Sequence, residues 1–392
     1  MCCRIHDRGV VMNKYFVMIL FALLLLLVPS CGKKAEETVS PEPKVTETGN
    51  VSSSTEDTAK TVTAAEKQAS PEENTVEAVK MEESELEAET VPVIPEDGEK
   101  RYEDNIFYTY SSSLGGFVVT ANAVTYPKDI VIPDTVDGIA VVRIGDYAFS
   151  GNSYITGNLI IPSSVKSIGD GAFCSCKSLT GLWLSEGVES IGEEAFLDCR
   201  ALGGDLFIPE SVTQVGNSAF GNCDGFDGEL HILGVADIGD GAFRGCDGFT
   251  ALHIFKAVSI GNSAFRGCTG FRGDLIIPES VETIGENAFR YCSGFSGDLI
   301  LPSSVRAIGE YAFASCTGFD GILILPSSLG SIEEGVFYDT EFSCDVIIPE
   351  SVKSIAREAF VGSHVTPYFT SACIGLAAGA FTEGTIIPPE LL

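Results

Sequence analysis

The sequence predicts a repeat solenoid, in which short parallel strands form one face and turns and one-turn helices form the other. Two observations support this fold class. A phenylalanine recurs every 22 to 24 residues. Many intervals also contain a segment of the form L-x-I-P followed by one of the form S-V-x-x-I-G. The recurring phenylalanines are Phe149, Phe173, Phe196, Phe220, Phe243, Phe265, Phe289, Phe313, Phe337 and Phe360, and a degenerate copy ends at Phe381.

A period of about 20–29 residues with Leu and Ile at fixed offsets is typical of a leucine-rich-repeat solenoid. In the copy that ends at Phe289, residues 275–278 are expected to be a strand that its Pro terminates, because Pro has no N–H for the ladder. Val281 and Ile284 should point inward, and Gly285 should let the backbone turn. The residue after this glycine is Asp, Asn or Glu and is expected to cap a one-turn helix. These residues are Asp170, Asn217, Asp240, Asn262 and Glu286.

A cysteine follows most of these phenylalanines after three residues. The members of this ladder are Cys176, Cys199, Cys223, Cys246, Cys268, Cys292 and Cys316. One Cys per coil places neighbouring thiols about 5 Å apart with the same orientation. We therefore expect small buried side chains whose S–H groups bond weakly to turn backbone, in preference to a metal string or disulfides. Cys174, Cys344 and Cys373 lie off the ladder, and the sequence leaves their state open.

The amino end has the outline of a secretory signal. Residues 1–30 contain an apolar run that ends at "VPSC", and the start at Met12 gives the signal a normal length. The ending resembles a bacterial lipobox, which implies cleavage before Cys31 and lipidation of that cysteine. An uncleaved membrane anchor is the alternative, although the run is shorter than the roughly 20 residues of a spanning helix. Residues 31–101 are then a lipidated cysteine and a disordered acidic tether.

The remaining residues, 102–392, form the predicted solenoid. We expect its amino cap at residues 102–125 and its carboxyl cap at residues 361–392, because exposed terminal coils need covers. Residues 105–392 hold 34 acids and 13 Lys or Arg, a net charge of −21. This charge argues against a nucleic-acid partner, because Lys and Arg side chains would have to neutralise its phosphates. It also disfavours direct binding to an anionic bilayer surface.

The middle residue of each L-x-I segment should point to the open face of the sheet, because strand side chains alternate between faces. We call these residues the strand-face column. They are Val131, Ile160, Trp183, Phe207, His231, His253, Ile276, Ile300, Ile324, Ile347 and Ile386. The column is apolar with an aromatic centre, and three of its copies replace the strand-ending Pro by Ser185, Leu233 and Phe255.

Trp183, Phe207, His231 and His253 are candidates for the centre of a docking stripe that Ile160 and Ile276 extend, because aromatic side chains often anchor interfaces. The alternative is that stacked side chains merely support each other along the ladder. Two His in adjacent copies could ligate a metal. The column contains no accompanying carboxylate or Cys, so we expect no metal site. Acidic columns beside the strands lack the spacing of a calcium loop and are expected to be solvated faces and helix caps.

The stretch "IGxxAFxxC" with its preceding "L-x-I-P" resembles the BspA-type, or treponemal-type, leucine-rich repeat from about Tyr126 to Pro388. The chain departs from that pattern by Phe in place of Leu, as at Phe226, and by a Gly-Asp or Gly-Glu insertion before many strands, as at Gly204-Asp205. The resemblance implies a bacterial surface or secreted protein that binds host matrix proteins or other bacteria.

Three functions remain open at this point. The first is a lipid-anchored surface adhesin that binds a host extracellular or bacterial surface protein, with the membrane reached only through its lipid. The second is a self-associating structural protein of the envelope, and the third is a capture component for a neighbouring enzyme or transporter. No nucleophile–base pair, P-loop or H-E-x-x-H motif is present. We therefore expect no enzymatic activity and no cofactor.

Overall fold

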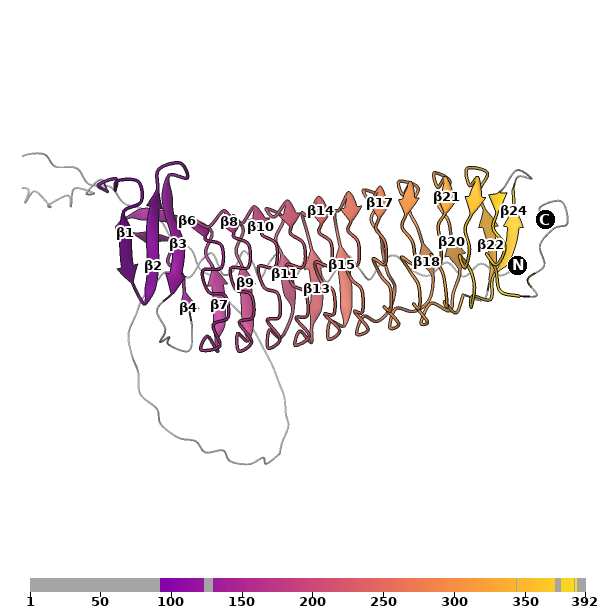
Figure 1. Ribbon diagram of the computed structural model, residues 1–392, viewed down its shortest axis with the longest axis horizontal. Coiled ribbons are helices and arrows are strands. Elements are labelled where there is room, and N and C mark those ends of the chain that lie inside the picture. The colour runs from indigo at the N-terminus through magenta and orange to yellow at the C-terminus, as the bar shows by residue number, and fades with distance from the viewer. Residues whose placement is uncertain (1–91, 123–129, 343, 371–374, 384, 386–392) are drawn as a thin grey trace, which may run out of the picture. The chain divides into compact units, whose positions relative to one another are not determined.

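The computed structural model describes residues 92–122, 130–342, 344–370, 375–383 and 385. In these residues the chain winds into coils that stack in sequence order (Figure 1). Every regular element in this part of the chain is a strand. The described residues therefore contain no helix that could cross a membrane. The expected signal segment, Cys31 and most of the tether lie outside the described residues.

One face of the stack is made by the L-x-I segments. Its strands are β4 (Ile130–Val131), β7 (Asn158–Ile161), β9 (Gly181–Leu184), β11 (Leu206–Ile208), β13 (Glu229–Ile232), β15 (Ala251–Ile254), β18 (Leu299–Ile300), β20 (Leu323–Ile324), β22 (Asp345–Ile348) and β24 (Thr366–Phe369). They pair in parallel as β4-β7-β9, β11-β13-β15, β18-β20 and β22-β24. Residues 275–278 are not a strand, although Leu275 and Ile277 are buried as the pattern requires.

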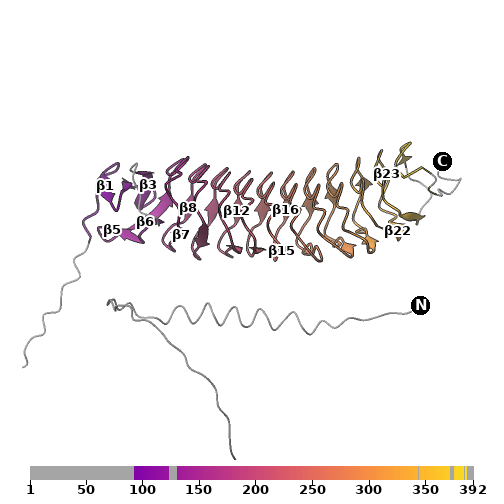
Figure 2. The same cartoon turned by 90° about the horizontal axis from the view of Figure 1, so that it is seen from below.

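The opposite face is also a sheet, which corrects the expectation of one-turn helices. Its strands are β8 (Ser167–Ile168), β10 (Ser190–Ile191), β12 (Gln214–Val215), β14 (Asp237–Ile238), β16 (Ser259–Ile260), β17 (Thr283–Ile284), β19 (Ala307–Ile308), β21 (Ser331–Ile332), β23 (Ser354–Ile355) and β25 (Gly375–Leu376). The first seven pair in the order β8-β10-β12-β14-β16-β17-β19 and continue the sheet of the amino end, and β21-β23-β25 form a separate sheet. Figure 2 shows the two faces as opposite edges of the coils.

The expected helix caps have a different role. In Asp170, Asn217, Asp240 and Asn262, the side-chain oxygen accepts a hydrogen bond from the backbone N–H of the equivalent residue in the next coil. Asp170 Oδ1 accepts from Glu193 at 2.9 Å, and Asp240 Oδ1 accepts from Asn262 at 2.7 Å. Asn262 Oδ1 then accepts from Glu286 at 2.8 Å. These oxygens therefore connect neighbouring coils and do not cap a helix.

Gly285 is required by close approach between coils and not by the turn. A Cβ on this residue would lie 2.6 Å from the backbone nitrogen of Asn262. The turn itself is made two residues later, where Asn287 has a φ of 56°. The same glycine recurs in every coil from Gly145 to Gly309, and we call these residues the glycine column; the next coil has Glu333 in this position. The long sheet also ends in the coil of Gly309, at β19.

The core is a stack of aromatic rings. From Phe149 to Phe381, each recurring phenylalanine is stacked on its neighbour with ring centroids 4.9–5.8 Å apart. The phenylalanines that replace Leu form a second stack from Phe226 to Phe342. Offset stacking contributes about 0.5–1.5 kcal/mol per pair beyond the burial of apolar area. The expectation that these phenylalanines fill the interior is confirmed.

The cysteine ladder is confirmed as a column of buried, free thiols. Each Sγ donates to the carbonyl oxygen of the recurring phenylalanine one coil earlier, as Cys292 does to Phe265 at 3.0 Å. Where the cysteine is replaced, Thr340 donates instead to Phe337 in its own coil at 2.9 Å. Burial raises the pKa of Cys316 to about 12, so its thiol is neutral. Cys174 and Cys344 are free and half-buried, and Cys373 lies outside the described residues.

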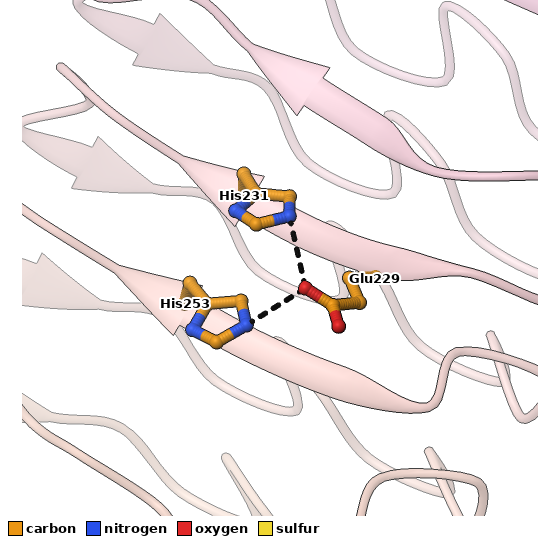
Figure 3. Close-up of side chains that lie close together, drawn as sticks. All are labelled: Glu229, His231 and His253. Carbon is orange, nitrogen blue, oxygen red and sulfur yellow. Dashed lines mark hydrogen bonds and ion pairs between the residues drawn. The ribbon is translucent and has the colours of Figure 1, made fainter. Parts of the chain in front are cut away.

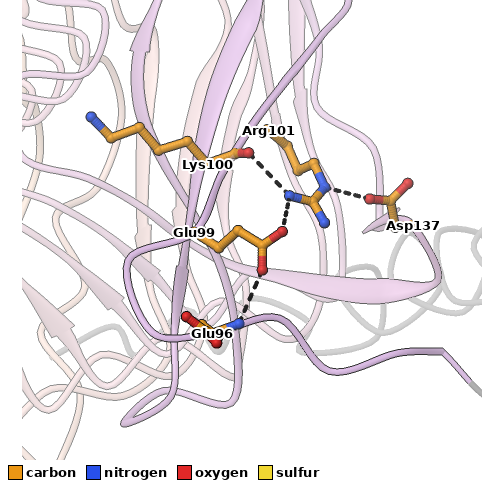
Figure 4. A network of polar contacts seen from close by, with 5 residues as sticks. All are labelled: Glu96, Glu99, Lys100, Arg101 and Asp137. Carbon is orange, nitrogen blue, oxygen red and sulfur yellow. Dashed lines mark hydrogen bonds and ion pairs between the residues drawn. The ribbon is translucent and has the colours of Figure 1, made fainter.

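The amino end is closed by antiparallel strands. β1 (Lys100–Glu103) pairs with β2 (Ile106–Ser111), and β2 pairs with β3 (Gly116–Asn122). β3 then pairs in parallel with β6 (Ile139–Ile144), which is also joined by β5 (Thr135–Val136). This cap therefore starts before Tyr102, and Arg101 secures it with hydrogen bonds of 2.6 Å to both Asp137 and Glu99 (Figure 4).

The carboxyl end continues the repeat. β24 pairs with β22, and β25 pairs with β23, both in parallel. Phe381 stacks on Phe360 at 5.0 Å. The described residues after residue 361, which we expected to form a cap, thus extend the solenoid by a further coil.

Candidate functional site

The strand-face column is exposed over much of the stack. Ile160, Trp183 and Ile276 are 53, 57 and 70% exposed. Val131, Ile300, Ile324 and Ile347 are exposed as well, and Ile386 lies outside the described residues. Single exposed apolar residues are ordinary, whereas a continuous row of them often marks an interaction surface. The expectation that these residues face outward is correct for this part of the column.

The centre of the column differs from the expectation. His231 is only 5% exposed, and Phe207 and His253 are half-buried. The reason is that the three rings stack on one another across β11, β13 and β15. The ring centroids of Phe207 and His231 are 4.4 Å apart, and those of His231 and His253 are 4.7 Å apart. Trp183 therefore remains exposed, while His231 is enclosed between two rings.

Glu229 completes a cluster that the sequence analysis did not identify. Its Oε2 lies 3.3 Å from Nε2 of His231 and 3.2 Å from Nε2 of His253 (Figure 3). Glu229 and His231 are two residues apart in β13, so both side chains leave the same face of the strand. Ala251 lies opposite Glu229 in β15 and is small, which leaves room for the carboxylate to reach His253. The i, i+2 spacing of "ELH" was the available signal; Glu229 was overlooked because it lies outside the strand-face column.

Burial sets the charge state of this cluster. The pKa of His231 is lowered by desolvation first, and then by the nearby His253. The carboxylate of Glu229 acts in the opposite direction. Desolvation is the largest effect, so His231 is held as a neutral imidazole near pH 7. A neutral imidazole can donate from one nitrogen and accept, or bind a metal, with the other.

A comparison with protein families matches the family described as "BspA type Leucine rich repeat region (6 copies)" to residues 124–227 and 236–366. The chain belongs to the BspA-type leucine-rich-repeat family. The resemblance seen in the sequence is thereby confirmed over more than half of the chain. A comparison with curated proteins finds no match.

Among solved structures, the chain is similar to a leucine-rich cell surface protein from Faecalibacterium prausnitzii A2-165, with 20% identity and a TM-score of 0.37 over 72% of this chain and 98% of that one. It is also similar to a leucine-rich-repeat protein from Bacteroides ovatus, with 21% identity and a TM-score of 0.43 over 72% and 92% of the two chains. The pneumococcal vaccine antigen PcpA is 18% identical, with a TM-score of 0.37 over 75% and 93%.

In this BspA-type chain, the Gly-Asp insertions have a structural role. Asp205 Oδ1 accepts the backbone N–H of Glu229 at 2.8 Å, and Asp298 Oδ1 accepts that of Ile322 at 2.8 Å. These carboxylates connect one coil to the next on the edge of the strand face. Glu229 occupies the same position but faces Ala251 in the following coil, so its carboxylate is available to the two histidines.

The copies without the strand-ending Pro gain a hydrogen bond at the end of the strand. Leu233 donates its N–H to the carbonyl of Ile208 at 3.1 Å, and Phe255 donates to that of Ile232 at 2.9 Å. Pro could form neither bond, because it lacks the N–H. The strands that carry His231 and His253 are therefore held in register over their full length.

Proposed function

We propose that this BspA-type chain is a cell-surface protein-binding module, an adhesin, whose partner docks on the strand-face column. The observation that carries this proposal is the row of exposed apolar side chains that includes Ile160, Trp183 and Ile276. Ile160 and Trp183 lie opposite each other on paired strands, and Ile276 lies between the buried Leu275 and Ile277, so little ordering entropy is lost when a partner binds. Trp183 is the residue best suited to be an energetic hot spot, because it is large, apolar and exposed.

The proposed partner is a folded protein, either from the host extracellular matrix or from another bacterial surface. The acidic net charge of −21 in residues 105–392 favours a partner with a basic rim around an apolar centre. The proposal includes display at the cell envelope through a lipid on Cys31. Mass spectrometry of the mature amino terminus tests this part, because a lipidated protein begins at Cys31 and carries the mass of acyl chains.

Binding of the purified full chain to immobilised matrix proteins and to bacterial surface extracts tests the docking face. We expect Trp183→Ala to weaken binding by at least about tenfold, which corresponds to roughly 1.4 kcal/mol. Tyr147→Ala is the matched control, because Tyr147 is an aromatic residue that is 62% exposed outside the column. Equal binding by both variants and the unchanged chain would contradict docking on the strand-face column.

Self-association is the second candidate function, and the exposed Ile300, Ile324 and Ile347 favour it. Two copies could cover these rows with each other and space layers of the envelope. Sedimentation of the full chain over a range of concentrations distinguishes this function. A monomer at high concentration speaks against it, and a dimer that Ile324→Ser dissociates supports it.

A further inference from the structure

We propose that Glu229, His231 and His253 form a binding site for a divalent transition-metal ion of the Zn²⁺ class. The site is independent of whether a protein docks on the strand-face column. In the part of the chain that the structure describes, these three side chains are the one group of metal-ligating residues whose ligand atoms all lie within 4.8 Å of each other. Two imidazoles and one carboxylate are a ligand set that suits zinc, copper or nickel, whereas calcium and magnesium prefer oxygen ligands.

Both distances from the Glu229 carboxylate to the imidazole nitrogens fit a tetrahedral site. Zn²⁺ binds imidazole nitrogen and carboxylate oxygen at about 2.0–2.2 Å, so two ligand atoms at the tetrahedral angle lie about 3.3–3.5 Å apart. Glu229 Oε2 lies 3.3 Å from His231 Nε2 and 3.2 Å from His253 Nε2. The three ligand atoms lie within 4.8 Å of one another, with Glu229 Oε2 between the two imidazole nitrogens (Figure 3).

The backbone holds the ligands without help from a metal. His231 and His253 are directly opposite each other in the paired strands β13 and β15. Glu229 lies two residues before His231 on the same strand, and its backbone N–H is bonded to Asp205. The ring of His231 is enclosed between those of Phe207 and His253. Such packing limits the rotamers of the ligands, which lowers the entropy cost of assembling the site.

Binding needs one small rearrangement. The two imidazole planes are now 16° from parallel, so their nitrogen lone pairs do not converge on one point. Rotation of the His253 ring is the easier movement, because its side chain is 32% exposed and that of His231 is 7% exposed. Each neutral imidazole then carries its proton on Nδ1 and presents Nε2 to the ion. Lowering of the His231 pKa by burial helps, because a protonated imidazole cannot be a ligand.

The site is open on one side. The Glu229 side chain is 45% exposed, so an ion can enter from solvent and its fourth position can hold water. Three protein ligands with one open position are typical of zinc sites that bind a further ligand. The other interpretation of the same geometry is a metal-free cluster, in which Glu229 simply accepts two N–H bonds. The two interpretations differ in what happens when Glu229 becomes Gln.

Isothermal titration of the full chain with ZnCl₂ at pH 7.5 tests the site, with four proteins compared. These are the unchanged chain, Glu229→Gln, His253→Ala and the control His364→Ala, which removes an exposed histidine outside the cluster. We expect the unchanged chain and the control to bind one ion with equal affinity. Glu229→Gln and His253→Ala should each lose more than the roughly 10–100-fold that even outer-shell substitutions cost.

Thermal unfolding provides the folding control. Without metal, Glu229→Gln should melt close to the unchanged chain, because the Gln amide oxygen still accepts an N–H bond. With Zn²⁺, the melting temperature should rise for the unchanged chain and the His364→Ala control alone, because a ligand of the folded state stabilises it. Equal affinity in all four proteins, or no binding in the unchanged chain, overturns the proposal.

The chain also has 13 cysteines, which could bind zinc on their own. Absorption spectra with Co²⁺ separate the two cases, because thiolate ligands add strong charge-transfer bands that imidazole and carboxylate do not. A Co²⁺ spectrum without these bands, lost in His253→Ala, supports the site. A thiolate spectrum that persists in His253→Ala overturns it.

Discussion

Replacement of Gly285 by Ala is a direct test of how closely the coils approach. The added Cβ would lie 2.6 Å from the backbone nitrogen of Asn262 and 2.7 Å from the carbonyl carbon of Gly261. Both atoms are backbone, so no flexible side chain can move aside. Overpacking of this kind costs about 1–3 kcal/mol. The smaller entropy of the unfolded Ala chain offsets about 0.4–1 kcal/mol of this cost. We therefore expect a net loss of about 1 kcal/mol.

The matched control is Gly330→Ala. Gly330 has no atom within 4 Å of an added Cβ and no positive φ, so only the entropy benefit remains. We expect this variant to be about 0.4–1 kcal/mol more stable than the unchanged chain. Urea unfolding followed by circular dichroism measures both, and the two midpoints should move in opposite directions. If Gly285→Ala unfolds at the same urea concentration as Gly330→Ala, close approach is not the reason for the glycine column.

Three further predictions concern the core and the cluster. Phe289→Ala should destabilise the fold by about 3–5 kcal/mol, whereas Trp183→Ala should change the melting temperature little; equal losses would mean that the buried and exposed faces are misassigned. Alkylation at pH 8 followed by peptide mass analysis should label Cys174 and leave Cys316 unlabelled, because burial raises the pKa of Cys316 to about 12; rapid labelling of Cys316 in the folded chain would contradict this. Folding lowers the pKa of His231, so the neutral imidazole contributes to stability above the unfolded-state pKa of about 6.5. This contribution is lost as the pH falls through the lower pKa of the folded state. The melting temperature of His231→Phe should therefore fall less between pH 7.5 and pH 5 than that of the unchanged chain, and identical falls would contradict the assignment.

The buried half of each coil could be predicted from the sequence. Phe289, Val281 and Cys292 recur at a fixed offset and are apolar or small, so periodicity alone identifies them as core. The thiols were correctly assigned to backbone hydrogen bonds, because one Cys per coil places neighbouring thiols in the same orientation and not facing each other. The outward direction of Trp183 followed from the alternation of side chains along a strand.

The connections between coils could not be predicted in the same way. Asp170 and Asn262 are good helix caps by composition, and nothing within one copy shows that their oxygens bond to the next coil. Gly285 was assigned to a turn because glycine permits positive φ, whereas its actual constraint comes from Asn262, 23 residues away. Glu229 was overlooked because its contact with His253 depends on the small Ala251 in the next strand. In each case the decisive neighbour belongs to another copy.

The parallel ladders between coils also determine how the protein would yield to tension. Their hydrogen bonds run along the stacking axis, so a pull on the two ends would break them one coil after another. Each released coil of 22 to 24 residues would add about 70–85 Å of extended chain. We expect the first release between β19 and β21, where the long sheet ends and the rings of Phe313 and Phe337 are 5.8 Å apart, the widest spacing in their stack. A solenoid held in this way would lengthen in steps under tension.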